Sequence, residues 1–176
     1  MVTRIAVAVF VTAAVASSGA SASASPAAAP PSQEQVERGK SLVWSIACND
    51  CHTPKKPGPR GPELDETRLL SGHRESPALP APPALPPGPW GVTYTANLTP
   101  DPETGLGLWT EQMFIRALRL GRHMGASRPI QPPMPWEVYG RLSDEDLKAI
   151  FAYLRSIPPV KNRVPDPVIA EPAPQD

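Results

Sequence analysis

Cysteine is scarce in this sequence of 176 residues, and neither sign of charge is in excess. The 17 Lys and Arg residues balance the 17 Asp and Glu residues, and only two cysteines are present. The charge balance gives no indication of a nucleic-acid partner or of an anionic membrane surface. The only long apolar run, close to the N-terminus, is shorter than the roughly 20 residues that span a bilayer.

The first 24 residues have the features of a secretory signal peptide. Arg4 supplies the positive start, residues 5–15 the apolar segment, and residues 20–24 the small-residue cleavage sites. We therefore expect a chain that is periplasmic or otherwise exported, with no stable membrane insertion after cleavage. An Ala/Pro linker is predicted over 25–31, one domain over 32–162, and a disordered polar tail over 163–176.

Alternating β-branched runs, which favour strands, are also missing. Proline is abundant instead, with 26 residues in all. Seven of them lie in residues 77–89 and four in residues 129–135. Since proline lacks an N–H and clashes with the preceding helical turn, both segments are predicted to be extended loops.

Three segments are predicted to be helices, which makes the expected fold class all-α. The first begins at a capping box, Ser32 with Gln35. The second begins at Thr110, and Gly121 supplies its C-terminal cap. The third begins at Ser143, continues with acidic residues that suit the helix dipole, and stops before two prolines. Apolar residues recur at helical spacing in the three segments: Val36, Gly39, Val43 and Ala47; Met113, Phe114, Ala117 and Leu118; Leu147, Ile150, Phe151 and Leu154.

The two cysteines form a C-x-x-C-H motif with Cys48, Cys51 and His52. This motif is the sequence signal for covalent attachment of a c-type haem. Two thiols at this spacing reach the two vinyl groups of one porphyrin, and the histidine meets the iron from the same side. No internal repeat is present, so we expect one haem.

Other interpretations of the two cysteines have less support. A thioredoxin-like site would lie between a strand and a helix, and the strands are missing. A structural zinc site needs about four ligands, for which only His73 and His123 remain. A plain disulfide leaves the adjacent His52 unexplained.

With this motif and the three helices, the chain resembles the class I monohaem cytochromes c, particularly cytochrome domains that serve bacterial periplasmic dehydrogenases. The likeness runs from about residue 38 to 165 and rests on these motifs: G-K-S-L at 39–42, C-x-x-C-H-T-P at 48–54, L-S-G-H at 70–73, N-L-T-P-D at 97–101, E-T-G-L-G at 103–107, P-M-P-W at 133–136, L-S-D-E-D-L at 142–147 and Y-L-R-S at 153–156.

The resemblance implies that the first and last helices cross, with Gly39 against Tyr153 or Phe151, because a residue without Cβ admits a ring. It also implies that the ring N–H of His52 donates to a proline carbonyl after the motif. The candidate acceptors are Pro57, Pro59 and Pro62.

The resemblance further places a methionine sulfur opposite His52, which raises the haem potential. Met113 lies on an apolar helix face and suits core packing. Met134 is favoured because prolines flank it and it precedes the cap of the last helix by nine residues. Met124, in a more mobile setting beside glycine, is the runner-up, and His123 or no protein ligand are further alternatives.

Several further residues are weaker candidates for a role in the haem site or at the surface. Haem propionates need donors when buried, and the candidates are Tyr94, Asn97, Trp109 and Arg116. His73 and His123 are predicted to be surface loop residues. A row of arginines on the second predicted helix is expected to be a solvated face, with a docking patch as the alternative: Arg116, Arg119 and Arg122.

The expected function is one-electron transfer, with no catalytic residue, a single covalent haem c held by Cys48, Cys51, His52 and Met134, and iron ligated by His52 and Met134. The expected partners are a periplasmic dehydrogenase as donor and an oxidase or another cytochrome as acceptor. Two alternatives remain: a haem enzyme or gas sensor with an open iron site, and an obligate cytochrome subunit of a periplasmic dehydrogenase.

Overall fold

The computed structural model describes residues 30–73 and 91–169, and the chain from Pro31 onward forms one compact unit. The predicted signal peptide, most of the linker, the proline-rich segment 77–89 and residues 170–176 lie outside the described residues. No helix in the described ranges is long and apolar enough to cross a membrane. The elements are α1 (Gln33–Ser45), α2 (Cys48–His52), β1 (Lys55–Gly58), β2 (Gly61–Leu64), α3 (Glu111–Leu120), α4 (Trp136–Tyr139) and α5 (Asp144–Ser156), with 3-10 turns at Glu66–Arg68 and His123–Gly125.

The three predicted helices are present as α1, α3 and α5. Each begins at the predicted cap, where a hydroxyl accepts a backbone N–H: Ser32 from Gln35, Thr110 from Met113, and Ser143 from Asp146. The prediction was wrong only at the end of the first helix. Ala47 was expected on its apolar face, but α1 ends at Ser45 and Ala47 has φ 62°. This left-handed residue ends one helix and starts the next.

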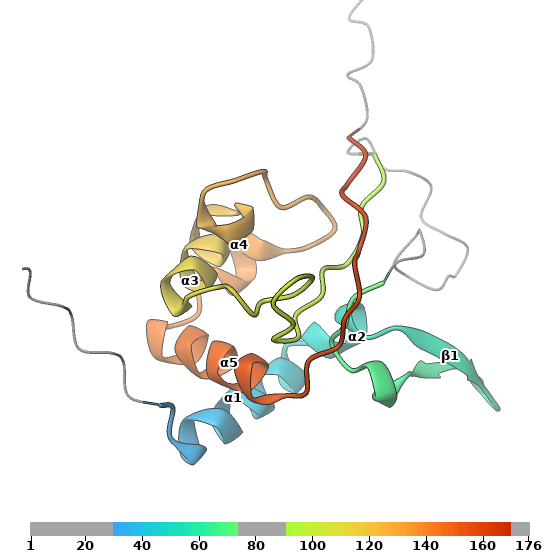
Figure 1. The fold of residues 1–176 in the computed structure, drawn as a ribbon, viewed down its shortest axis with the longest axis horizontal. Helices are drawn as coiled ribbons and strands as arrows, with labels where there is room; N and C mark the ends of the chain where they lie inside the picture. The colour runs from blue at the N-terminus through green and yellow to red at the C-terminus, as the bar shows by residue number, and fades with distance from the viewer. Residues whose placement is uncertain (1–29, 74–90, 170–176) are drawn as a thin grey trace, which may run out of the picture. The chain divides into compact units, whose positions relative to one another are not determined.

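Helices α1 and α5 cross at Gly39, and Figure 1 shows this pair of helices together. A Cβ at Gly39 would overlap the backbone of Ala149 and lie 2.9 Å from the Cβ of Tyr153. The expected contact of Gly39 with Tyr153 is therefore confirmed. Phe151 instead packs against Phe114 of α3, with ring centroids 5.4 Å apart.

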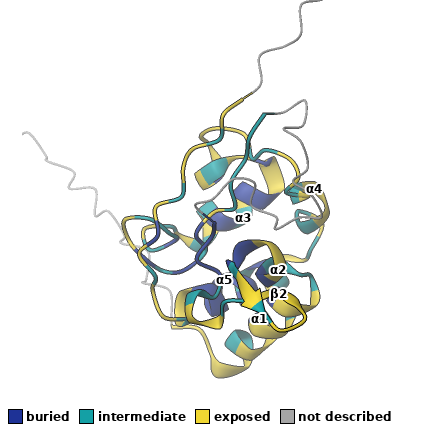
Figure 2. Ribbon diagram, turned by 90° about the vertical axis from the view of Figure 1, so that its right-hand side faces the viewer, coloured by how far each residue is buried: buried dark blue, intermediate teal, exposed yellow. Residues whose placement is uncertain are grey.

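The expectation of an all-α domain needs one correction, because β1 and β2 form an antiparallel hairpin after the C-x-x-C-H motif. Pro57 stands opposite Pro62 in this hairpin. Proline cannot donate to a strand ladder, so such positions survive only in edge strands, and both strands of a two-stranded hairpin are edges. The hairpin is largely exposed and extends away from the helices (Figure 1, Figure 2).

The hydrophobic core lies among α1, α3 and α5. Figure 2 shows buried residues along the inner faces of α3 and α5. Val43, Leu147 and Leu154 are fully buried, and Phe114 and Leu118 of α3 belong to the same cluster. The core therefore joins the two crossing helices to α3, which forms part of the functional site.

Candidate functional site

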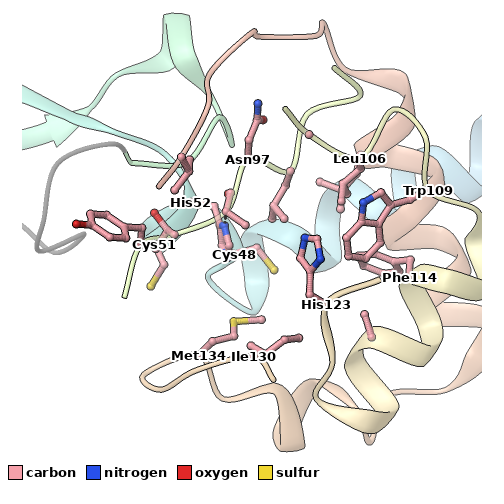
Figure 3. A pocket seen from close by; sticks show the side chains of 18 of the residues that line it. Cys48, Cys51, His52, Asn97, Leu106, Trp109, Phe114, His123, Ile130 and Met134 are labelled. Carbon is pink, nitrogen blue, oxygen red and sulfur yellow. Dashed lines mark hydrogen bonds between the residues drawn. The ribbon is translucent and has the colours of Figure 1, made fainter. Parts of the chain in front are cut away.

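A cavity of about 500 Å³ opens between α2, α3, α5 and the loops that connect them. Aliphatic and aromatic side chains make up most of its wall. The four residues predicted to hold the haem, Cys48, Cys51, His52 and Met134, all line it. Met134 lies across the cavity from His52 (Figure 3). A cavity of this size and character is typical of a cofactor site.

Cys48 and Cys51 lie one turn apart on α2, so both side chains reach the same cavity. Both are free thiols. Burial raises the pKa of the Cys48 thiol to about 12, and burial followed by the nearby Asp50 carboxylate raises the pKa of Cys51. Both thiols are therefore protonated at neutral pH, although Cys51 is exposed and Cys48 is partly buried.

His52 is buried, and its Nδ1 lies 2.8 Å from the carbonyl oxygen of Ala96. Since a carbonyl only accepts, Nδ1 must carry the proton, which leaves Nε2 with a free lone pair. Burial also lowers the pKa of His52, so the ring is neutral. The expected acceptor was wrong: Pro57, Pro59 and Pro62 lie in the β1–β2 hairpin, and Ala96 holds the ring instead.

The segment 70–73 fixes the position of Ala96. The N–H of Gly72 donates to the carbonyl of His52 at 2.7 Å, and the N–H of Leu98 donates to the carbonyl of Leu70 at 2.9 Å. Gly72 has φ 77°, and a Cβ there would lie 2.5 Å from the carbonyl oxygen of Thr95. Only glycine suits both the backbone conformation and this close approach.

The prediction that His73 is a surface residue was wrong. His73 is buried, and its Nε2 donates to the carbonyl of Thr53 at 2.8 Å. His123 is half-buried, lines the cavity and meets the ring of Trp109 edge-on at 5.1 Å. Burial lowers the pKa of His123. His123 is therefore part of the cavity wall, and His73 holds the backbone just after the C-x-x-C-H motif.

Two of the four candidate propionate donors do not suit that role. The amide of Asn97 donates to Thr104 Oγ1 at 3.1 Å and to the carbonyl of Val160 at 2.8 Å, so its hydrogens are already used. Arg116 is exposed and does not line the cavity. Tyr94 and Trp109 do line it.

Arg116 and Arg119 of α3, and Arg122 just after it, lie at the surface, in agreement with a solvated face. Arg119 forms an ion pair with Asp144 at 2.6 Å and donates to the carbonyl of Gly140. Arg122 donates to the carbonyl of Ser127 at 3.1 Å. These contacts join the end of α3 to the start of α5 and to the loop that follows α3.

The tail was predicted to be disordered from residue 163, and for residues 163–169 this was wrong. Val168 exchanges two backbone hydrogen bonds with Val92, each 2.8 Å long. Residues 163–167 line the cavity. No apolar periodicity marks this segment, which is why sequence reasoning missed it.

The sequence pattern of the cytochrome c family matches residues 36–158, so the chain belongs to this family of electron-transfer proteins. Members of the family carry a covalently bound c-type haem. The match covers the C-x-x-C-H motif, α3, α5 and Met134, and ends just before the segment that contains residues 163–167.

Relatives of the chain include cytochrome subunits of bacterial dehydrogenases. One subunit of the nicotinate dehydrogenase of Pseudomonas putida is 31% identical over 136 residues, 76% of this chain and 10% of that protein. The cytochrome c subunit of a quinone alcohol dehydrogenase from Gluconobacter oxydans is 43% identical over 44% of this chain and 17% of its own. The fructose dehydrogenase cytochrome subunit of Gluconobacter japonicus is 30% identical over 72% of this chain and 22% of its own. The chain thus spans only a tenth to about a fifth of these relatives.

Proposed function

We propose that this chain is an electron carrier that holds one c-type haem in the cavity, attached to Cys48 and Cys51 and ligated by His52 and Met134. The observation that carries the proposal is that all four side chains line one apolar cavity. When bound, haem supplies a one-electron couple at its iron. The protein's part is to fix the two ligands, exclude water and present the neutral Nε2 of His52.

Met134 suits the ligand role better than Met124, although both line the cavity. Met134 is partly buried and packs against the hydrophobic core, and its N–H donates to the carbonyl of Gln131 at 3.3 Å. Met124 is 38% exposed and has φ 54°, an uncommon conformation for a residue with a side chain. A side chain held in one place costs less entropy when it binds.

The ligand assignment is tested by comparing the exported, haem-loaded wild type with Met134→Ala and Met124→Ala. We expect Met134→Ala alone to lose the absorption band of the bond between the haem iron and the methionine sulfur. This variant should also have a much lower midpoint potential and bind carbon monoxide rapidly when reduced. Loss of the band in Met124→Ala alone would make Met124 the ligand. Rapid carbon monoxide binding by the wild type would favour the open iron site of a haem enzyme or gas sensor.

The haem number and the export are tested on the same preparation. One C-x-x-C-H motif supports one haem per chain, which a haem extraction assay measures against protein concentration. Two haems per chain would contradict the proposal. Cleavage after the predicted signal peptide should give a mature N-terminus close to Ser25, which N-terminal sequencing detects in the periplasmic fraction.

The relatives support a dehydrogenase as the electron donor, since the names of two of them describe cytochrome subunits of an alcohol dehydrogenase and a fructose dehydrogenase. An oxidase or another cytochrome is the proposed acceptor. Affinity purification of the tagged chain from the periplasm of its own organism distinguishes an obligate cytochrome subunit from a free electron carrier. A stoichiometric redox subunit would identify an obligate cytochrome subunit, and a monomeric haem protein would identify a free carrier.

A further inference from the structure

Residues 163–168, near the end of the described chain, include one wall of the cavity at 163–167, and we refer to them as the C-terminal strap. The strap is held at both ends. Before it, the buried amide of Asn162 donates to the carbonyls of Ser71 and Gly72 at 2.8 and 3.1 Å. At its end, Val168 pairs with Val92. Figure 1 shows the strap (red) beside the segment that starts at residue 91 (green).

The strap lies outside the part of the chain that the family pattern matches, which ends at residue 158. Its residues nonetheless line the cavity throughout 163–167. Two prolines, Pro165 and Pro167, keep it extended at low entropy cost. A segment that is fixed at both ends and faces a cofactor cavity can present a side chain to the cofactor in a defined place.

Charge is distributed unevenly around the cavity. Among the described residues, four ionised side chains line it, and three of them have a counter-charge. Glu103 pairs with Lys161 at 2.8 Å, and Asp166 of the strap pairs with Arg128 at 3.6 Å. Arg163 has no ion pair or hydrogen bond within the described ranges. Arg163 is therefore an exposed arginine that lines the cavity and that no other described residue neutralises.

A guanidinium beside an apolar cavity favours an anionic group in the ligand. Haem carries two carboxylates on one edge, and a carboxylate that enters an apolar site needs charged or hydrogen-bonding partners. Arginine meets a carboxylate with two parallel N–H groups, which makes the pair both strong and directional. Of the donors expected from the sequence, Asn97 is engaged elsewhere and Arg116 does not line the cavity.

We propose that Arg163, carried by the C-terminal strap, binds a haem carboxylate and so makes the strap part of the cofactor site. This inference rests on the haem site proposed above. Arg163 then neutralises a negative charge that would otherwise stabilise the oxidised, more positive iron, and it thereby raises the midpoint potential. It also keeps the carboxylate ionised, because an adjacent cation lowers a carboxyl pKa.

The test is a potentiometric titration of the full-length haem-loaded protein at several pH values, for the wild type, Arg163→Gln, Arg163→Lys and Arg60→Gln. Arg60 lies in the exposed turn between β1 and β2, so its variant changes the net charge equally, away from the cavity. We expect Arg163→Gln to shift the potential downward. We also expect that potential to fall further as pH rises through the neutral range, since the carboxylate now titrates there.

Arg163→Lys keeps the charge but loses the two parallel N–H groups, so its potential should lie above that of Arg163→Gln and at or below that of the wild type. The inference is overturned if Arg163→Gln has the same potential and pH profile as Arg60→Gln, or if Arg163→Lys behaves like Arg163→Gln. Arg163→Gln should retain haem, because the proposed bonds to Cys48 and Cys51 do not involve Arg163, so its comparison with Arg60→Gln decides the inference. A wild-type chain without a covalent haem spectrum would instead refute the proposed function.

Discussion

At the scale of single residues, Gly72 controls the site most directly, because it separates His52 from the segment that carries Ala96. We predict that Gly72→Ala weakens the His52–Ala96 hydrogen bond. The left-handed φ costs a side chain roughly 1–2 kcal/mol, and the contact with Thr95 adds about 1–3 kcal/mol of overpacking. Denaturant unfolding measures the sum, and nitrogen NMR of the His52 ring reports the hydrogen bond.

Gly61→Ala is the matched control for this change. Gly61 has φ 123°, yet a Cβ there would meet nothing within 4 Å. Gly61→Ala should therefore show the backbone cost alone and leave the His52 signal unchanged. Equal destabilisation by the two substitutions would contradict the argument that Gly72 is needed for close packing.

Asp101 gives a prediction of pH dependence. Its Oδ1 accepts from the Thr104 hydroxyl at 2.6 Å and from the N–H of Thr104 and Glu103 at 2.8 and 3.2 Å. These bonds, the Thr104 hydroxyl first, lower the pKa of Asp101. The ionised carboxylate thus stabilises the fold above its unfolded pKa of about 3.9, and this contribution is lost as pH falls through the lower folded pKa.

Asp101→Asn cannot ionise and should lack that contribution. We expect it to be less stable than the wild type at neutral pH and to lose less stability between about pH 5 and pH 2. Urea unfolding at a series of pH values measures both slopes. Parallel curves for the two proteins would mean that the carboxyl pKa is the same in the folded and unfolded chains.

The residues expected to bind the haem were easier to predict than the residues that hold them in position. Cys48, Cys51, His52 and Met134 follow from a local motif and from proline flanks, and they do meet at one cavity. The carbonyl that holds His52 belongs to Ala96, which is 44 positions away in the chain. Every residue type has a backbone carbonyl, so the amino-acid sequence does not indicate which carbonyl accepts this hydrogen bond, and only the fold shows it. The burial of His73 was missed for the same reason, because its partner is a carbonyl.

At the scale of elements, the crossing of α1 and α5 depends on Gly39. We predict that Gly39→Ala lowers the free energy of unfolding by about 3 kcal/mol or more, since the new Cβ meets the backbone of Ala149, which cannot rotate away. Because α1 leads directly into α2, the substitution should also disturb haem attachment. Lys40→Ala, on the exposed side of α1, should change stability by less than about 0.5 kcal/mol. Similar values for both variants would contradict the close crossing.

The helices were predictable because each has caps and an apolar face with helical period. The β1–β2 hairpin and the C-terminal strap were not, because their sequences carry prolines and no periodic apolar pattern. The hairpin forms from two short strands with a two-residue turn, and the strap is held by one backbone pair and one buried amide. Such elements depend on tertiary contacts rather than on local propensity.

At the scale of the whole domain, the haem cavity and the hydrophobic core share a wall. Phe114 and Leu118 of α3 and Ile150 and Leu154 of α5 belong to the core cluster and also line the cavity. When the cavity is empty, these apolar side chains face water instead of a cofactor, and the hydrophobic stabilisation from burying them is lost. A domain whose net stability is only about 5–15 kcal/mol is sensitive to such a loss.

We therefore predict that the exported double variant Cys48→Ala/Cys51→Ala, which cannot hold haem covalently, has no cooperative unfolding transition. α1 and α5 keep their mutual contact at Gly39 and should retain part of the helical circular dichroism. α3, whose inner face needs the filled cavity, should lose fixed packing, with loss of the near-ultraviolet signal and binding of a hydrophobic dye. Adding free haem should restore part of the structure, because His52 and Met134 remain. A cooperative transition of wild-type midpoint without haem would show that the cavity walls support themselves.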